Sequence, residues 1–185
     1  MSYPQHQKGF TLIEIMIVVM IIGLSAGMAT LAFTPDDTSR LEEAADKFLL
    51  QTEFVAEQTT LTGEVIGLFV RPTQSREGEQ WCYRWRRFRN SSWQPVSDFL
   101  PDQCLQPDMG VEMIVEGEEY EYDPNLTSPE PVMIFYPSGE ATPLEIALFA
   151  QFDSEQDVQR LEVDMMGRVR WLNREQAIAQ REAEL

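Results

Sequence analysis

The residues Lys8-Gly9-Phe10-Thr11-Leu12-Ile13-Glu14 lead into an apolar run that continues to Phe33. The run from Phe10 to Phe33 has 24 residues. A helix of that length is roughly 36 Å long, enough to cross the roughly 30 Å hydrocarbon core of a bilayer. The run therefore predicts one membrane-spanning helix. A carboxylate inside it costs on the order of 2.5–3.5 kcal/mol near the centre, so Glu14 is a candidate functional residue that needs a partner.

The composition limits what the rest of the chain can be. Its 185 residues allow one membrane segment and one modest domain with a real core. The net charge of −17 makes nucleic acid or an anionic lipid surface an unfavourable main partner. The only histidine is His6, and two cysteines cannot by themselves supply four ligands for zinc.

Cys82 and Cys104 fit one disulfide in an oxidising compartment, and two unpaired buried thiols are the alternative. A disulfide closing a loop of this length would contribute roughly 3 kcal/mol in the chain-entropy model.

The amino-terminal segment does not have the pattern of a secretory signal peptide. Its apolar run is too long, and Glu14 would interrupt the apolar core of such a peptide. Lys8 precedes the run and favours a cytoplasmic amino terminus with an exported domain. A plain single-pass anchor is the alternative.

The residues Lys8–Glu14 resemble the type IV prepilin signature, which pilins share with the pseudopilins of type II secretion. The resemblance implies that a prepilin peptidase removes the leader, residues 1–9, by cutting between Gly9 and Phe10. It also implies N-methylation of Phe10 and retention of residues 10–34 as a transmembrane and filament-core helix.

Glu14 acquires a candidate partner from this resemblance. Cleavage would give Phe10 a free positive amine, and pairing two charges offsets much of their cost in a bilayer. Pairing with the amine of a neighbouring subunit would make Glu14 an assembly contact, whereas an incidental membrane carboxylate is the alternative. Gly23 and Gly27 form a small-xxx-small pattern for helix packing, although glycine is also common in membrane helices by chance.

The chain beyond Pro35 predicts one amphipathic helix followed by strands. Apolar residues recur at three- and four-residue steps from Leu41 to Thr59, so the helix should end near Gly63 and pack on a sheet. Short β-prone runs follow, bounded by turn residues. They are Val65–Val70, Trp81–Phe88, Val111–Val115, Val132–Tyr136, Ile146–Phe152, Leu161–Met165 and Val169–Leu172. This order predicts an α+β fold whose long amino-terminal helix packs on antiparallel β-sheets.

Three further stretches are similar to the H-type minor pseudopilins of type II secretion: Ser25–Met28, Thr62–Glu64 and Phe135–Pro143. The resemblance implies a pilin-like domain with a helix on two antiparallel sheets, expected here at residues 35–172 and in the periplasm. Residues 173–185 form a polar tail, either frayed or a solvent-exposed helix.

No catalytic constellation stands out, so neither an enzyme nor a cofactor is expected. The acidic segment Glu116–Asp123 could offer oxygen ligands to calcium, but a solvated loop or edge strand is favoured because the spacing is not that of an EF-hand. The run Trp81–Arg89 alternates aromatic residues with arginines. A strip for single-stranded DNA is one interpretation, and a half-buried strand whose arginines meet acidic residues is favoured.

The resemblance implies a minor pseudopilin of the type II secretion pseudopilus, which helps folded proteins leave the periplasm across the outer membrane. The expected partners are major and minor pseudopilins, the prepilin peptidase and the inner-membrane secretion platform. The expected location is the bacterial inner membrane, crossed once. A minor pilin of a type IV pilus, with a role in DNA uptake, is the first alternative, and an anchored periplasmic binding domain is the second.

Overall fold

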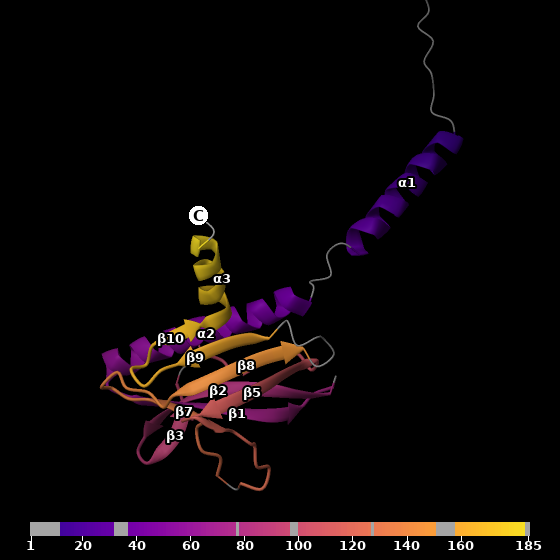
Figure 1. The fold of residues 1–185 in the computed structure, drawn as a ribbon. Coiled ribbons are helices and arrows are strands. Elements are labelled where there is room, and N and C mark those ends of the chain that lie inside the picture. The colour runs from indigo at the N-terminus through magenta and orange to yellow at the C-terminus, as the bar shows by residue number, and fades with distance from the viewer. Residues whose placement is uncertain are drawn as a thin grey trace, which may run out of the picture. The chain divides into compact units, whose positions relative to one another are not determined.

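A computed structural model describes residues 12–31, 37–76, 78–96, 100–126, 128–150 and 158–183, with the backbone alone for residues 24–31 and 37. The chain divides into two compact units, Met1–Asp36 and Asp37–Leu185. Helix α1 (Leu12–Leu31) belongs to the first unit, and all other elements belong to the second (Figure 1). No helix among the described residues is both long enough and apolar enough to cross a membrane. The predicted membrane segment, residues 10–34, extends past the described residues at both ends and stays a prediction.

Helix α2 (Asp37–Thr62) is the predicted amphipathic helix. Its buried side chains follow the three- and four-residue steps of the sequence pattern; they are Leu41, Ala45, Phe48, Thr52, Val55 and Thr59. The hydroxyl of Thr52 donates to the carbonyl of Phe48 at 2.6 Å, which satisfies this buried polar group within the helix. Gly63 ends the helix with a φ of 69° and donates its N–H to the carbonyl of Thr59 at 3.0 Å.

Two antiparallel sheets follow α2. The first has the order β3-β2-β1-β7, with β4 also paired to β2, and the second has the order β10-β9-β8-β5-β6. The strands of the first sheet are β1 (Val65–Gln74), β2 (Glu79–Arg89), β3 (Ser92–Pro95), β4 (Gln103–Cys104) and β7 (Met133–Phe135). The strands of the second sheet are β5 (Met109–Val115), β6 (Glu118–Glu119), β8 (Leu144–Ala150), β9 (Gln159–Val163) and β10 (Val169–Trp171).

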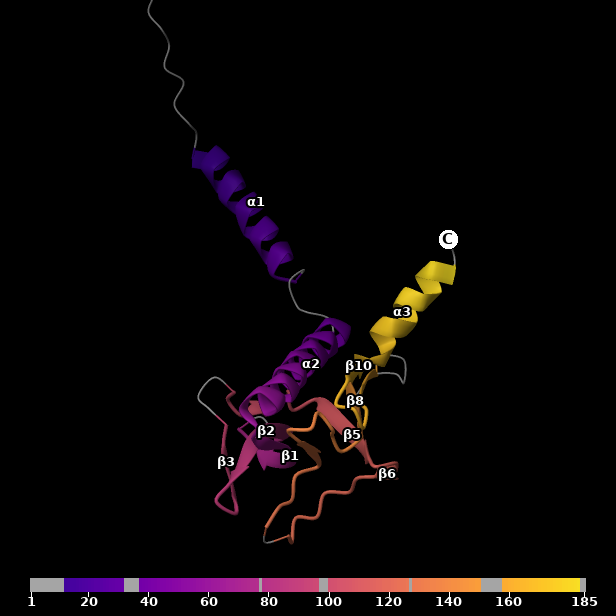
Figure 2. The same ribbon diagram turned by 90° about the vertical axis from the view of Figure 1, so that its left-hand side faces the viewer.

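Both sheets and α2 contribute to one hydrophobic core (Figures 1 and 2). Phe48 of α2 meets Tyr83 of β2 edge to face, with ring centroids 5.4 Å apart. The ring centroids of Trp85 in β2 and Phe135 in β7 are 6.1 Å apart, and both side chains are fully buried. The predicted α+β class, with a helix packed on antiparallel sheets, is confirmed.

Each predicted strand is present, with shifted ends. The strand predicted at Ile146–Phe152 begins earlier, at Leu144, and Phe152 lies outside the described residues. The prediction missed β3, β4 and β6, which have four, two and two residues. Strands this short carry no periodic pattern of their own, and pairing with a longer neighbour is what makes them extended.

The turn between β9 and β10 requires a glycine. Gly167 has a φ of 70°, and a Cβ there would lie 2.6 Å from the carbonyl oxygen of Gly139. Met166-Gly167 therefore lies in the turn that joins β9 to β10, and the tertiary contact is a second reason for glycine.

Helix α3 (Leu172–Ala183) is the solvent-exposed helix that was one of two alternatives for the tail, and it has no buried residue. Its first turn is tied to the rest of the unit by Arg174. The guanidinium of Arg174 bonds to Asp46 of α2 at 3.1 Å and lies 4.0 Å from the centre of the Trp171 ring. Beyond this turn the helix leads away from β10 (Figure 2).

Candidate functional site

Glu14 lies in the first turn of α1 and its side chain is exposed. The unpaired N–H groups at the start of a helix favour a carboxylate there. Gly9 and Phe10, predicted to flank the cleavage site, lie outside the described residues, so the proposed pairing of Glu14 with the amine of Phe10 stays a prediction.

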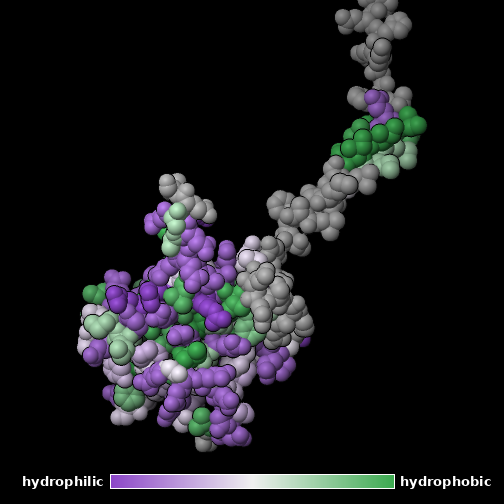
Figure 3. Space-filling view, viewed as in Figure 1, coloured by the Kyte–Doolittle hydropathy of each residue, from purple (hydrophilic) through white to green (hydrophobic). Residues whose placement is uncertain are grey.

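Apolar side chains cover α1 on every side. From Leu12 to Ile22 the large apolar residues are exposed, with Val18 the least at 46% and Leu12 the most at 80%. Because these positions are consecutive, the described side chains from Leu12 to Ile22 leave no polar face apart from Glu14. The side of this segment that Figure 3 shows is mostly hydrophobic. A monomeric soluble protein rarely exposes such a continuous apolar surface, so these side chains need an apolar surface or solvent to cover them.

The predicted packing glycines both lie in α1. A Cβ at Gly23 would meet nothing within 4 Å, so no part of this chain uses that gap among the described residues. The side-chain surroundings of Gly27 are outside what the structure describes. The role of both glycines in helix packing stays a prediction.

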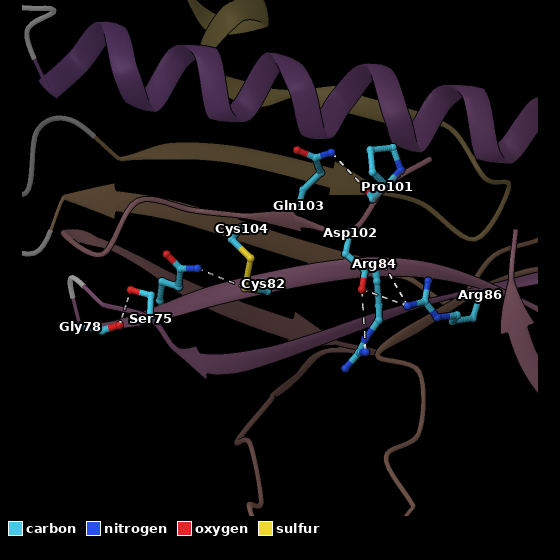
Figure 4. Close-up of a disulfide and its surroundings, with 10 residues drawn as sticks. Ser75, Gly78, Cys82, Arg84, Arg86, Pro101, Asp102, Gln103 and Cys104 are labelled. Carbon is cyan, nitrogen blue, oxygen red and sulfur yellow. Dashed lines mark hydrogen bonds and ion pairs between the residues drawn. A yellow bond between two sulfur atoms is a disulfide. The ribbon is translucent and has the colours of Figure 1, made fainter. Parts of the chain in front are cut away.

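Arg84 and Arg86 lie on one face of β2, and Arg87 and Arg89 lie on the other. Arg86 donates to both oxygens of Asp102 at 2.9 and 3.0 Å, and Arg84 reaches the same carboxylate at 3.9 Å (Figure 4). On the other face, the carboxylate oxygens of Glu64 lie 2.5 Å from a guanidinium nitrogen of Arg89 and 3.6 Å from one of Arg87. The favoured interpretation, a half-buried strand whose arginines meet acids, describes this arrangement.

The surroundings of Arg84 disfavour its positive charge, although the carboxylate of Asp102 is near. Its partial burial and the neighbouring guanidiniums of Arg71 and Arg86 lower its pKa, and Asp102 and Tyr122 act in the opposite direction. The guanidinium remains charged, but it lacks the close partner that Arg86 has.

Cys82 and Cys104 form a disulfide in the structure, so β4 is linked covalently to β2 (Figure 4). The two cysteines are directly paired in the ladder, as are Tyr83 and Gln103. Extending this antiparallel register by one more residue brings Asp102 opposite Arg84.

Asp102 and Glu64 are the functional partners that sequence reasoning missed. One signal could have found Asp102, because it precedes Cys104 by two residues just as Arg84 follows Cys82 by two. An antiparallel disulfide therefore places the acid and the arginine together. Glu64 had no comparable signal.

The acidic segment Glu116–Asp123 forms a tight turn and the edge strand β6. Glu116 and Gly117 have φ values of 53° and 87°, and Glu118 and Glu119 are exposed at the edge of the sheet. Within the described ranges, no group of three or more potential metal-ligating side chains comes together. Acidic residues on an edge discourage pairing with other strands.

Three comparisons place this geometry among known proteins. The family model of the prokaryotic N-terminal methylation motif matches residues 4–30, the region of the predicted cleavage and methylation. The chain is 26% identical, over 89% of its length and 92% of the relative, to type II secretion system protein H of Pectobacterium carotovorum subsp. carotovorum. It is also 26% identical, over 92% of its length and 96% of the relative, to the protein of the same name in Aeromonas hydrophila.

The fold is similar to that of a solved structure, the minor pseudopilin EpsH from the type II secretion system of Vibrio cholerae. The TM-score is 0.59, and the match covers 74% of this chain and 95% of the solved chain at 15% identity. These comparisons confirm the predicted resemblance to type IV prepilin-like proteins and to H-type minor pseudopilins.

Proposed function

We propose that this chain is an H-type minor pseudopilin of a type II secretion system. The observation that carries the proposal is α1, an apolar helix exposed on all sides with a single carboxylate in its first turn. It precedes a helix-and-two-sheet unit, and nearly the whole chain is related to proteins named for that system. The role is structural, and the chain acts as a subunit rather than as an enzyme.

The proposed mechanism begins with cleavage between Gly9 and Phe10 by a prepilin peptidase and methylation of the new amine. The methylation motif over residues 4–30 supports this step. The retained helix, residues 10–34, anchors the subunit in the inner membrane with the Asp37–Leu185 unit in the periplasm. Other pseudopilins then cover the apolar side chains of α1 when the subunit leaves the membrane.

Glu14 sets the register of that assembly in this proposal. A carboxylate four residues from the cleaved terminus can pair with the amine of a neighbouring Phe10. The apolar surroundings make an unpaired charge costly. The axial position in which Glu14 pairs with the neighbouring amine is therefore favoured over positions that leave both charges unpaired. The inner-membrane secretion platform would act on the assembled filament.

The test replaces Glu14 by Gln in the only chromosomal copy. We expect secretion of folded exoproteins and co-purification with other pseudopilins to fall while membrane insertion is retained. Glu42→Gln, on the exposed face of α2, is the matched control. Normal secretion by the Glu14→Gln strain would overturn the register role.

Mass spectrometry of the wild-type chain tests the processing step separately. We expect a mature amino terminus at methylated Phe10, and an uncut chain in a Gly9→Val variant. An unprocessed wild-type terminus would remove the pseudopilin assignment itself. A secretion defect without any defect in pilus function distinguishes this role from that of a type IV minor pilin.

A further inference from the structure

A groove of about 700 Å³ lies on the face of the first sheet that α2 does not cover. Its floor is formed by β1 and β2, and its walls are the β2–β3 turn and the long connection from β6 to β7, which hangs below the sheets in Figure 1. We call it the arginine groove, and its defining residues are Phe69, Arg71, Arg84, Trp93 and Tyr122.

Two cations of the groove lack a close anion. Arg71 is exposed, and no described carboxylate lies within ion-pair distance of it. Arg84 reaches Asp102 only at 3.9 Å, because the short bonds of that carboxylate go to Arg86. The guanidinium of Arg71 is near enough to lower the pKa of Arg84, so an added carboxylate would bind next to two positive charges.

The wall formed by the connection from β6 to β7 carries acidic side chains, which disfavour binding of a polyanion in the groove. Asp123 and Glu130 line it, and one oxygen of Asp123 accepts from the N–H and the side-chain amide of Asn125 at 2.8 and 3.0 Å. A nucleic acid, with a phosphate at every nucleotide, would face these acids as well as the chain's net charge of −17. A ligand with one or two carboxylates on one side can avoid them.

The edge of β1 offers main-chain groups to an extended ligand. Ser75 donates its N–H to the carbonyl of Gly78 at 2.8 Å, which makes this a hydrogen-bonded pair at the end of the β1–β2 ladder. In an antiparallel pair every second residue bonds to the partner strand, so the main-chain groups of Leu68, Val70 and Pro72 point away from β2. Leu68 uses its carbonyl for Val132, at 2.8 Å, and β7 pairs no further along this edge. Val70 in the groove therefore presents a donor and an acceptor, and Pro72 presents an acceptor only.

Aromatic rings supply the apolar part of the floor. Phe69 and Phe88 both pack against Trp93; the ring centroid of Trp93 lies 5.3 Å from that of Phe69 and 5.1 Å from that of Phe88. Phe88 is 47% exposed, so the aromatic surface continues beyond the groove. Phe69 is already buried, so apolar side chains of a bound strand would cover the exposed parts of Trp93 and Phe88.

We propose that the arginine groove binds an extended, acidic polypeptide segment of a partner protein. A carboxylate of the segment bonds to Arg71 and Arg84, its main chain pairs with Val70, and its apolar side chains lie on Trp93. The short stretch of unpaired edge restricts strand pairing to the residues next to Val70, so the charge contact decides specificity. The proposal concerns the Asp37–Leu185 unit and does not depend on filament assembly.

The test uses the full chain in lipid nanodiscs and a display library of random heptapeptides. We expect the library to enrich peptides with an acidic residue at one constant position between apolar residues. A synthetic copy of the best peptide should bind at least about tenfold more weakly to Arg71→Gln and to Arg84→Gln, because each variant removes a charge-assisted bond. Arg168→Gln, an exposed arginine of the β9–β10 turn, is the matched control and should bind normally.

Three outcomes would overturn the proposal: no acidic enrichment, enrichment that the arginine variants do not reduce, or equal competition by oligothymidylate. Self-association of the wild-type chain that Arg71→Gln abolishes would identify a second copy as the occupant and would also overturn it. Arg71 has no ion-pair partner among the described residues, so its variant stays informative if Arg84→Gln fails to fold.

Discussion

Asp102 accepts two hydrogen bonds from one guanidinium nitrogen of Arg86, at 2.9 and 3.0 Å. The contact joins the loop before β4 to the middle of β2, across 16 residues of sequence. Cys104 lies two positions after the acid and is bonded to Cys82 in the same strand pair. The covalent link and the ion pair therefore hold the same short segment against the sheet.

Asp102→Asn should destabilise the fold by about 1 kcal/mol, because Asp102 is half exposed and the charge of Arg86 would lose its close partner. The free energy of unfolding in urea, followed by tryptophan fluorescence, measures the change. The difference from wild type should shrink in high salt, which screens the lost attraction. Glu118→Gln, on the exposed strand β6, should change the free energy by less than about 0.5 kcal/mol. Equal effects of the two variants would contradict the importance of the Asp102 contact.

Removing the disulfide should cost about 3 kcal/mol of unfolding free energy in the Cys82→Ser/Cys104→Ser variant. The two cysteines are 22 residues apart, and the bond limits the unfolded chain by closing that loop. Urea unfolding of the reduced wild-type chain provides the control and should match the double variant. If the oxidised and reduced forms unfold at the same urea concentration, the bond does not stabilise this fold.

Phe48→Ala should lower the unfolding free energy by about 3–5 kcal/mol, because the ring is 1% exposed and fills the space between α2 and β2. Leu50 lies two residues further along the same helix and is 57% exposed. Leu50→Ala should therefore cost less than about 0.5 kcal/mol. Similar losses in the two variants would mean that α2 packs with another face on the sheets.

Alkaline pH should destabilise the folded unit through Tyr83. Burial raises the pKa of Tyr83, whereas the unfolded chain titrates near its ordinary value of about 10. Above that value the unfolded state loses the proton and the folded state keeps it, so stability is present below about pH 10 and falls as the pH rises.

Tyr83→Phe should reduce this alkaline loss in urea unfolding measured between about pH 9 and pH 11.5. A smaller slope should remain from Tyr120, whose pKa is also raised by burial and by Tyr122. An unchanged slope in Tyr83→Phe would show that another group causes the alkaline effect.

Periodicity was enough to predict the main elements of the domain. The apolar steps from Leu41 to Thr59 specify both the helix and the face that it buries, because 3.6 residues per turn leave one stripe toward the core. The alternation in Trp81–Arg89 likewise separated the buried Tyr83 and Trp85 from Arg84 and Arg86. The strands β3, β4 and β6 escaped prediction, since each is too short to carry a pattern of its own and is extended only by pairing with β2 or β5.

The sequence by itself determined the character of α1, the position of Glu14 in its first turn and the inward face of α2, because each follows from the order of residues along one helix. Only the tertiary structure decided that Asp102 meets Arg86, that Glu64 meets Arg89 and that Arg71 stays without a close anion among the described residues. These outcomes depend on how loops bring distant residues to one face of a sheet. Charge composition cannot predict them, because the same acids could neutralise any of the arginines until the strand register selects the pairs.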